Sequence, residues 1–191
     1  MEERTLPTSR QLKEELRREQ HKGDYGRTLR STVYLLVVVA AAAVLAATLL
    51  FPVLRVTGTS MEPSLENKQI VLALKNSDFK RGDIVAFYYN NKILLKRVIA
   101  FPGEQVDIRS DGTVYVGGEP LQEPYLAEKS LGECDLEFPY QVPDGKIFVM
   151  GDHRATSVDS RSSAIGCISD EFVVGKVVLR VWPLQKIGLL A

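Results

Sequence analysis

The strongest constraint on the fold is one long stretch without charge. No charged residue occurs between Arg30 and Arg55, and the segment Ser31–Leu54 is rich in valine, alanine and leucine. As an α-helix rising about 1.5 Å per residue, this segment would cross a hydrocarbon core of about 30 Å. We therefore predict a single transmembrane helix over residues 31–54.

Two other interpretations of the apolar run fit less well. A cleavable signal peptide would explain the small residues Ala40–Ala43 and Ala46-Ala47. Its apolar region, however, is usually only about 7 to 15 residues long. A buried helix of a soluble domain normally carries a polar face, which this run lacks. A membrane anchor accounts for both the length and the composition.

The charges that flank the run predict its orientation. The basic residues before it are Arg4, Arg10, Lys13, Arg17, Arg18, Lys22, Arg27 and Arg30. After it, only Arg55 occurs before Lys68. Because cytoplasmic flanks carry the excess of positive charge, residues 1–30 should form a cytoplasmic segment and residues 55–191 an extracytoplasmic domain of a single-pass protein in the cell membrane. Residues 1–29 mix both charge signs with few bulky apolar side chains, which predicts a solvated helix or disorder.

From Lys68 onward, short runs rich in Val, Ile, Phe and Tyr alternate with turn signals such as Asn90-Asn91 and Asp111-Gly112. The expected strands are residues 69–74, 84–89, 93–101, 105–108, 113–116, 146–150 and 173–181. The fold class is therefore mainly β, with one N-terminal transmembrane helix followed by an extracytoplasmic all-β domain. Residues 105–144 should form a small β-rich insertion with a structural role.

The stretch Val56–Leu65, directly after the apolar run, contains a candidate nucleophile, Ser60. Gly58 permits the tight backbone that brings a serine hydroxyl to a substrate carbonyl, and Pro63 stiffens the chain beyond it. A serine beside a glycine and a proline is more often part of a simple turn. The significance of Ser60 therefore depends on two later stretches.

The second stretch is the apolar run Ile93–Phe101, which contains two adjacent cations, Lys96 and Arg97. Strand alternation or snorkelling sends both charges of such a pair to water in most cases. If one of them acts on Ser60, it is Lys96, because a guanidinium stays protonated whereas burial lowers an ammonium pKa from about 10.4. Lys96 is therefore the candidate general base for the Ser60 hydroxyl.

The third stretch, Gly151–Arg161, is dense in polar residues and follows the apolar strand Ile147–Met150. As an isolated segment it is typical of a solvated loop. Beside Ser60 and Lys96, its side chains offer a supporting network, because Ser157 can orient the lysine amine and Asp159 can pair with Arg161.

Together the three stretches resemble the bacterial type I signal peptidases, membrane-anchored serine/lysine endopeptidases of family S26. The resemblance extends from the apolar run to Trp182-Pro183. The matching residues are Ser60-Met61 with Pro63, Lys96-Arg97-Val98 with Pro102-Gly103-Glu104, and Gly151-Asp152 with Ser157, Asp159, Ser160 and Arg161. It implies an enzyme that removes signal peptides from exported preproteins after small residues, at Ala-X-Ala sites. The implied partners are secretory preproteins and membrane lipid, with no cofactor.

Residue by residue, the resemblance implies that Ser60 attacks the scissile carbonyl and that Lys96 takes the proton and later returns it to the leaving amine. The implied supporting residues are Ser157, Asp159 and Arg161. The Ser60 backbone amide would donate to the oxyanion. In some family members a serine two residues before the nucleophile is a second donor, but this chain has Gly58 there.

Two positions of the last motif depart from the family, with His153 and Ala155 where asparagine and aspartate are common. Because His153 is the only histidine after the apolar run, a Ser60–His153–Asp159 triad is an alternative. One histidine leaves too few ligands for a transition-metal site.

Several further points stay open. Cys134 and Cys167 allow one disulfide, and the sequence favours neither the bridge nor two free thiols. Apolar residues near 53–56, with Leu72, Ile84, Leu94 and Leu95, should form the walls of the substrate pocket. The alternative function is a catalytically silent, membrane-tethered β module that binds extended peptides. A self-cleaving repressor is disfavoured by the apolar run, and a net charge of zero gives no field that would recruit nucleic acid.

Overall fold

The computed structural model describes residues 8–190, and it describes residues 19–25 by their backbone alone. The chain divides into two compact units, with the boundary between Leu49 and Leu50. Residues 1–7 of the predicted cytoplasmic segment lie outside the described residues.

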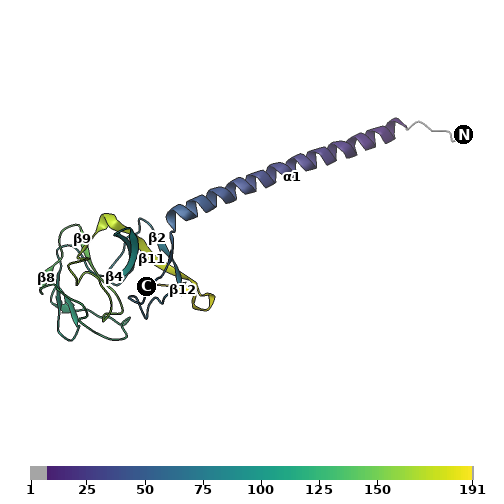
Figure 1. The fold of residues 1–191 in the computed structure, drawn as a ribbon. Helices are drawn as coiled ribbons and strands as arrows, with labels where there is room; N and C mark the ends of the chain where they lie inside the picture. The colour runs from purple at the N-terminus through teal and green to yellow at the C-terminus, as the bar shows by residue number, and fades with distance from the viewer. Residues whose placement is uncertain (1–7, 191) are drawn as a thin grey trace. The chain divides into compact units, whose positions relative to one another are not determined.

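The described part of the first unit belongs to a single long helix, α1 (Ser9–Leu50), whose last residue is the first of the second unit and which is drawn as one unbroken coil in Figure 1. Its first turn is stabilised by a hydrogen bond from the Thr8 N–H to the Gln11 side chain at 2.9 Å, one half of a capping box. The part Gly26–Leu50 is long and apolar enough to cross a membrane. The sequence predicts either a solvated helix or disorder for residues 1–29. The described part of this segment is helical.

The predicted transmembrane helix extended to Leu54, whereas α1 ends at Leu50. Pro52 explains the difference, because proline disfavours helical geometry at the residue before it and has no N–H for a helical hydrogen bond. The apolar residues after Pro52 instead begin strand β1 (Val53–Arg55), which pairs with β2 (Ile70–Leu74).

The second unit is built on an antiparallel sheet in the order β1-β2-β11-β3-β4-β9-β10, with β12 paired to β11. The remaining bounds in this sheet are β3 Ile84–Tyr89, β4 Lys92–Ala100, β9 Lys146–Met150, β10 Ile168–Ser169, β11 Val173–Trp182 and β12 Gly188–Leu189. Two short 3₁₀ helices flank β11, namely η1 (Asp170–Phe172) and η2 (Leu184–Lys186). The mainly β prediction is confirmed.

A smaller sheet has the order β7-β6-β5-β8 and lies in the predicted insertion. Its strands are β5 Gln105–Ile108, β6 Val114–Val116, β7 Glu119–Pro120 and β8 Tyr140–Gln141. Every strand expected from the sequence is present. The strands that the sequence did not indicate, β1, β7, β8, β10 and β12, have only two or three residues each.

The β3–β4 hairpin fixes the position of the two adjacent cations. Its turn residues Asn90 and Asn91 have φ values of 44° and 59°, as a tight two-residue hairpin requires. The resulting register sets Lys96 opposite Val85, and on the other side of β4 it sets Arg97 opposite Met150. The end of β9 therefore carries Gly151 and the polar stretch after it to the middle of β4.

Candidate active site

Ser60 lies in a tight turn that follows β1. Gly58 has a φ of 91°, in the left-handed region that favours glycine, and the Glu62 N–H donates to the Thr59 carbonyl at 3.0 Å. The Ser60 carbonyl accepts a hydrogen bond from the His153 N–H at 3.0 Å. This bond joins the turn to the polar stretch that follows β9.

Lys96 is buried, with 3% of its surface exposed. Its Nζ donates a hydrogen bond of 2.7 Å to the Ser157 hydroxyl, which donates in turn to Asp159 Oδ2 at 2.7 Å. Burial lowers the pKa of Lys96 from 10.5 to about 8, an effect that the negative charge of Asp159 opposes and the positive charge of Arg161 reinforces. A substantial fraction of the amine is therefore neutral near pH 8 and can accept a proton.

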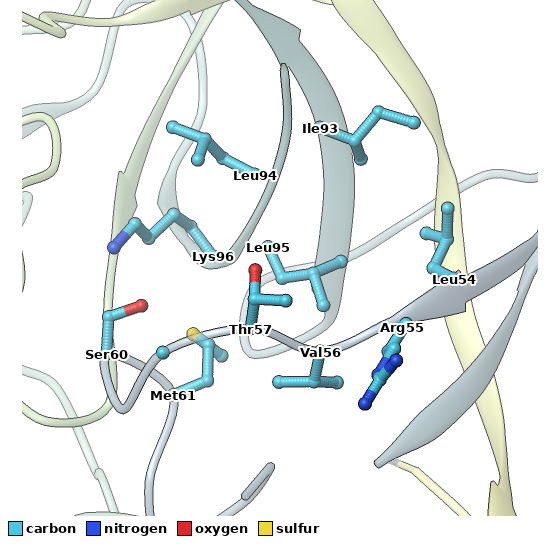
Figure 2. Close-up of a pocket in the computed structure, with 11 residues that line it drawn as sticks. Leu54, Arg55, Val56, Thr57, Ser60, Met61, Ile93, Leu94, Leu95 and Lys96 are labelled. Carbon is cyan, nitrogen blue, oxygen red and sulfur yellow. The ribbon is translucent and has the colours of Figure 1, made fainter. Parts of the chain in front are cut away.

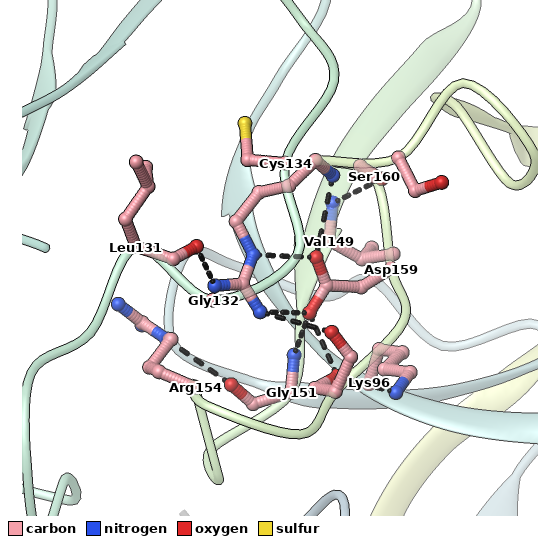
Figure 3. A network of polar contacts seen from close by, with 12 residues as sticks. Lys96, Leu131, Gly132, Cys134, Val149, Gly151, Arg154, Asp159 and Ser160 are labelled. Carbon is pink, nitrogen blue, oxygen red and sulfur yellow. Dashed lines mark hydrogen bonds and ion pairs between the residues drawn. The ribbon is translucent and has the colours of Figure 1, made fainter.

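Asp159 is at the centre of a buried polar network (Figure 3). Its two carboxylate oxygens accept from Arg161 Nε at 2.8 Å and Arg161 Nη2 at 2.9 Å, and Oδ2 also accepts from the Gly151 N–H at 2.9 Å. Burial alone would raise the pKa of Asp159, but the hydrogen bonds and charge of Arg161 hold it below its ordinary value. The carboxylate is thus ionised and fixes the Ser157 hydroxyl.

Arg97 makes a separate buried ion pair on the other face of β4. Its guanidinium donates to both oxygens of Asp152, at 2.8 and 2.6 Å. Two adjacent cations in a strand are commonly expected to expose both of their charged groups to water. This expectation is wrong here, because Lys96 and Arg97 are 3% and 2% exposed. Each has partners that compensate for its burial.

Ser60 and Lys96 share one pocket, with a volume of about 110 Å³. Figure 2 shows both side chains at the same end of it, with the lysine amine on the side of the serine. The lining residues are Leu54, Arg55, Val56, Thr57, Gly58, Ser60, Met61, Ile93, Leu94, Leu95 and Lys96. Two segments, the chain after α1 and strand β4, therefore form its walls.

The predicted walls are correct only in part. Leu54, Val56, Leu94 and Leu95 line the pocket, but Leu72 and Ile84 do not. Leu72 does not reach the pocket because it lies on β2, which is the second strand of the sheet, behind the edge strand β1. Ile84 does not reach it because this residue is 2% exposed within a hydrophobic core cluster.

Two apolar lining residues, Met61 and Ile93, are not among the predicted walls. The signal for Met61 is its position directly after Ser60. The signal for Ile93 is its spacing of two residues from Leu95, which places these two side chains on one face of β4.

The alternative triad is not assembled. The exposed ring of His153 has its Nδ1 2.7 Å from the Thr156 hydroxyl. Asp159 is bonded instead to Arg161, Ser157 and Gly151.

The two cysteines are free thiols. Cys134 Sγ lies 3.9 Å from the Leu136 carbonyl oxygen, and Cys167 Sγ lies 4.0 Å from the Tyr140 hydroxyl. Among the side chains that the structure describes, residues 8–18 and 26–190, no group of three or more histidine, cysteine, aspartate or glutamate residues is arranged to hold a metal ion.

The amino-acid sequence of the chain is similar to one known family of proteins. The family described as signal peptidase, peptidase S26, matches residues 29–182. Signal peptidase I of Bacillus amyloliquefaciens is 34% identical over 163 residues, which cover 80% of this chain and 87% of the relative. Signal peptidase I of Bacillus licheniformis is 35% identical over 165 residues, covering 80% and 88%.

A solved signal peptidase I from Enterococcus faecalis V583 has 33% sequence identity and a TM-score of 0.46, covering 52% of this chain and 97% of its own. The family match spans the stretches that contain Ser60, Lys96 and Gly151–Arg161 and about half of α1, and the Bacillus relatives align along most of their own length. The chain therefore belongs to the S26 signal peptidase family.

Proposed function

We propose that this chain is a membrane-anchored serine endopeptidase that removes signal peptides from exported preproteins, with Ser60 as nucleophile and Lys96 as general base. The observation that carries the proposal is the buried amine of Lys96, whose pKa is about 8, at the same end of one pocket as Ser60. A serine hydroxyl is a weak nucleophile until a positioned base takes its proton, and a desolvated lysine can do so.

In the proposed reaction, Ser60 Oγ attacks the carbonyl carbon of the scissile peptide and its proton passes to Lys96 Nζ. The ammonium then returns the proton to the leaving amine, which departs as the new N-terminus and leaves an ester on Ser60. Water, deprotonated by the same amine, hydrolyses that ester and regenerates the serine hydroxyl.

The Ser60 N–H is our candidate donor to the oxyanion. It donates no hydrogen bond to another group within the described part of the chain, so it is available to the substrate. Gly58 supplies no side-chain donor at the position where some relatives have serine. The supporting roles fall to Ser157, which holds the Lys96 amine, and to the Asp159–Arg161 pair, which fixes Ser157.

The substrate that suits this pocket is an extended peptide with small side chains near the cleaved bond. Its walls come from the edge strand β1 with its continuation and from the first half of β4, where β9 pairs only from Arg97 onward. Peptides commonly bind to strand edges as an added strand. A cavity of about 110 Å³ between Val56, Leu94 and Leu95 accommodates alanine-sized groups and excludes large ones by overlap. We therefore assign Ala-X-Ala sites as the preferred cleavage sequence.

We further propose that α1 anchors the enzyme with the N-terminus in the cytoplasm and the β domain on the outer face. The support is the excess of lysine and arginine before the apolar segment. Near the C-terminus, the β domain exposes the apolar side chains Trp182, Leu184, Ile187 and Leu189. These are suited to contact with lipid, where a preprotein would present its cleavage site.

The test is cleavage of a detergent-solubilised preprotein with an Ala-X-Ala site, with the cut position read by mass spectrometry. Wild type and His153→Ala should both release the mature protein directly after the second alanine. A substrate with phenylalanine in place of that alanine should resist cleavage. Loss of activity in a folded His153→Ala variant would instead support the triad, and a folded wild type without activity would support the peptide-binding module.

The pKa of Lys96 predicts the pH dependence of the reaction. Because the neutral amine is the active form, kcat/KM should rise about tenfold per pH unit at low pH. It should level off above the Lys96 pKa of about 8. The measurement is kcat/KM between about pH 6 and pH 10 with one fixed substrate. A limb centred near the ordinary histidine pKa of about 6.5 would contradict the assignment of Lys96 as the base.

A further inference from the structure

The insertion, residues 105–144, is packed directly against the strands that carry the site. Its strand residues Val106 and Val114 share one buried core cluster with Ile99 of β4 and Met150 of β9. Ile99 follows Lys96 by three residues, and Met150 directly precedes Gly151. The insertion is therefore in a position to affect the polar stretch after β9.

A buried ion pair connects the insertion to that stretch. The side chains of Glu123, from the insertion, and Arg154 are 1% and 0% exposed. Arg154 Nη1 donates to Glu123 Oε2 at 3.3 Å, and Arg154 Nη2 donates to Glu123 Oε1. Arg154 Nε also donates to the Gly151 carbonyl at 3.1 Å. The Arg154 side chain thus links Glu123 to Gly151, the residue whose N–H donates to Asp159.

Two further contacts come from the same part of the insertion. The Leu131 carbonyl accepts from Arg161 Nη1 at 2.6 Å, next to Gly132, where an added Cβ would lie 2.8 Å from that nitrogen. The ring of Tyr125 stacks on the guanidinium of Arg97, 3.9 Å from its centroid. All three buried arginines around the site are therefore in contact with residues 123–132.

Net stability does not account for a buried ion pair at this position. Desolvation of two charges offsets most of their attraction, and apolar residues of similar volume are often as stable. A guanidinium has a fixed fork of donors, so it can join Glu123 and the Gly151 carbonyl in one geometry, which apolar residues cannot do. The arrangement is suited to fixing the position of a backbone segment.

We propose that Glu123 and Arg154 are positioning residues, which hold the stretch 151–157 so that the Ser157 hydroxyl meets the Lys96 amine. This inference rests on the proposed peptidase function. Displacement of Gly151 by about 1 Å would separate Ser157 from Lys96 and cost about a hundredfold in rate. The charged groups that act on Lys96 are Asp152, within this stretch, and Asp159 and Arg161, which follow it directly, so a displacement of the stretch would change the surroundings of the Lys96 amine.

The experiment compares full-length wild type with two variants and a control in detergent. Glu123→Gln removes the negative charge, and the double variant Glu123→Leu with Arg154→Met removes both charges. Glu137→Gln, an exposed residue of the same insertion, is the matched control. For each protein, the melting temperature, kcat/KM for preprotein cleavage and the pH profile of kcat/KM are measured.

We expect kcat/KM to fall about a hundredfold in both variants, with the limb of the pH profile moving to higher pH as Lys96 becomes hydrated. The double variant should recover the melting temperature that Glu123→Gln loses, but not the activity. Glu137→Gln should match wild type in every measurement.

Recovery of both stability and activity in the double variant would overturn the positioning role, and so would an unchanged pH profile or loss of folding in both variants. A wild-type protein that cleaves no preprotein would contradict the proposed function itself. The two failures are therefore distinguishable.

Discussion

Cleavage of the preprotein should fall by about four to six orders of magnitude when either Ser60 is replaced by alanine or Lys96 by methionine. Ser60→Ala removes the attacking oxygen, and Lys96→Met removes the buried amine that shares the pocket with it. Because the two groups act in one proton transfer, the double variant should be no slower than either single variant. The measurement is single-turnover cleavage with enzyme in excess.

Lys92→Met is the matched control for this prediction. Lys92 begins the same strand, β4, but is exposed, so its loss should change the rate by less than about twofold. A Lys96→Met enzyme with more than about one per cent of wild-type activity would show that another group takes the proton.

Substitution of Gly151 by alanine should lower kcat/KM at least about a hundredfold. A Cβ at this position would overlap the Ser157 hydroxyl and lie 2.5 Å from the Ser60 carbonyl oxygen. Neither group can yield without changing the site, because one binds Lys96 and the other belongs to the nucleophile turn. The melting temperature should fall as well, since overpacking of this kind costs about 1 to 3 kcal/mol.

Gly188→Ala provides the comparison, because a Cβ at Gly188 would have no heavy atom within 4 Å. This variant should retain wild-type activity and melting temperature. If Gly151→Ala were equally active, Ser157 could not be the group that holds the Lys96 amine.

Local patterns were sufficient to predict the larger elements of the fold. The strands with clear runs of β-branched and aromatic residues, such as Ile84–Tyr89 and Lys146–Met150, occur within a residue of the expected bounds. Strands β1, β7, β8, β10 and β12 have too little pattern of their own, since only their pairing with another strand defines them. The end of α1 was overestimated because the apolar residues after Pro52 continue the composition of the helix but belong to β1.

For the candidate site, chemistry was more informative than periodicity. The difference between an ammonium and a guanidinium singled out Lys96 before any contact was known, and the structure then placed it against Ser157. The burial of Arg97 could not be anticipated, because its partner Asp152 is 55 residues away. The same holds for Glu123 and Arg154, which are 31 residues apart and meet only through tertiary packing.

The contact between Lys96 and Ser157 joins residues 61 positions apart, and the turn of Ser60 is bonded to the backbone of His153 from still farther along the chain. Contacts of such long range form late, after the intervening chain has paired into sheets. A newly synthesised molecule would therefore gain proteolytic competence only when its β domain is complete. Immature copies would be unable to cut neighbouring chains, or their own apolar helix, while folding was still in progress.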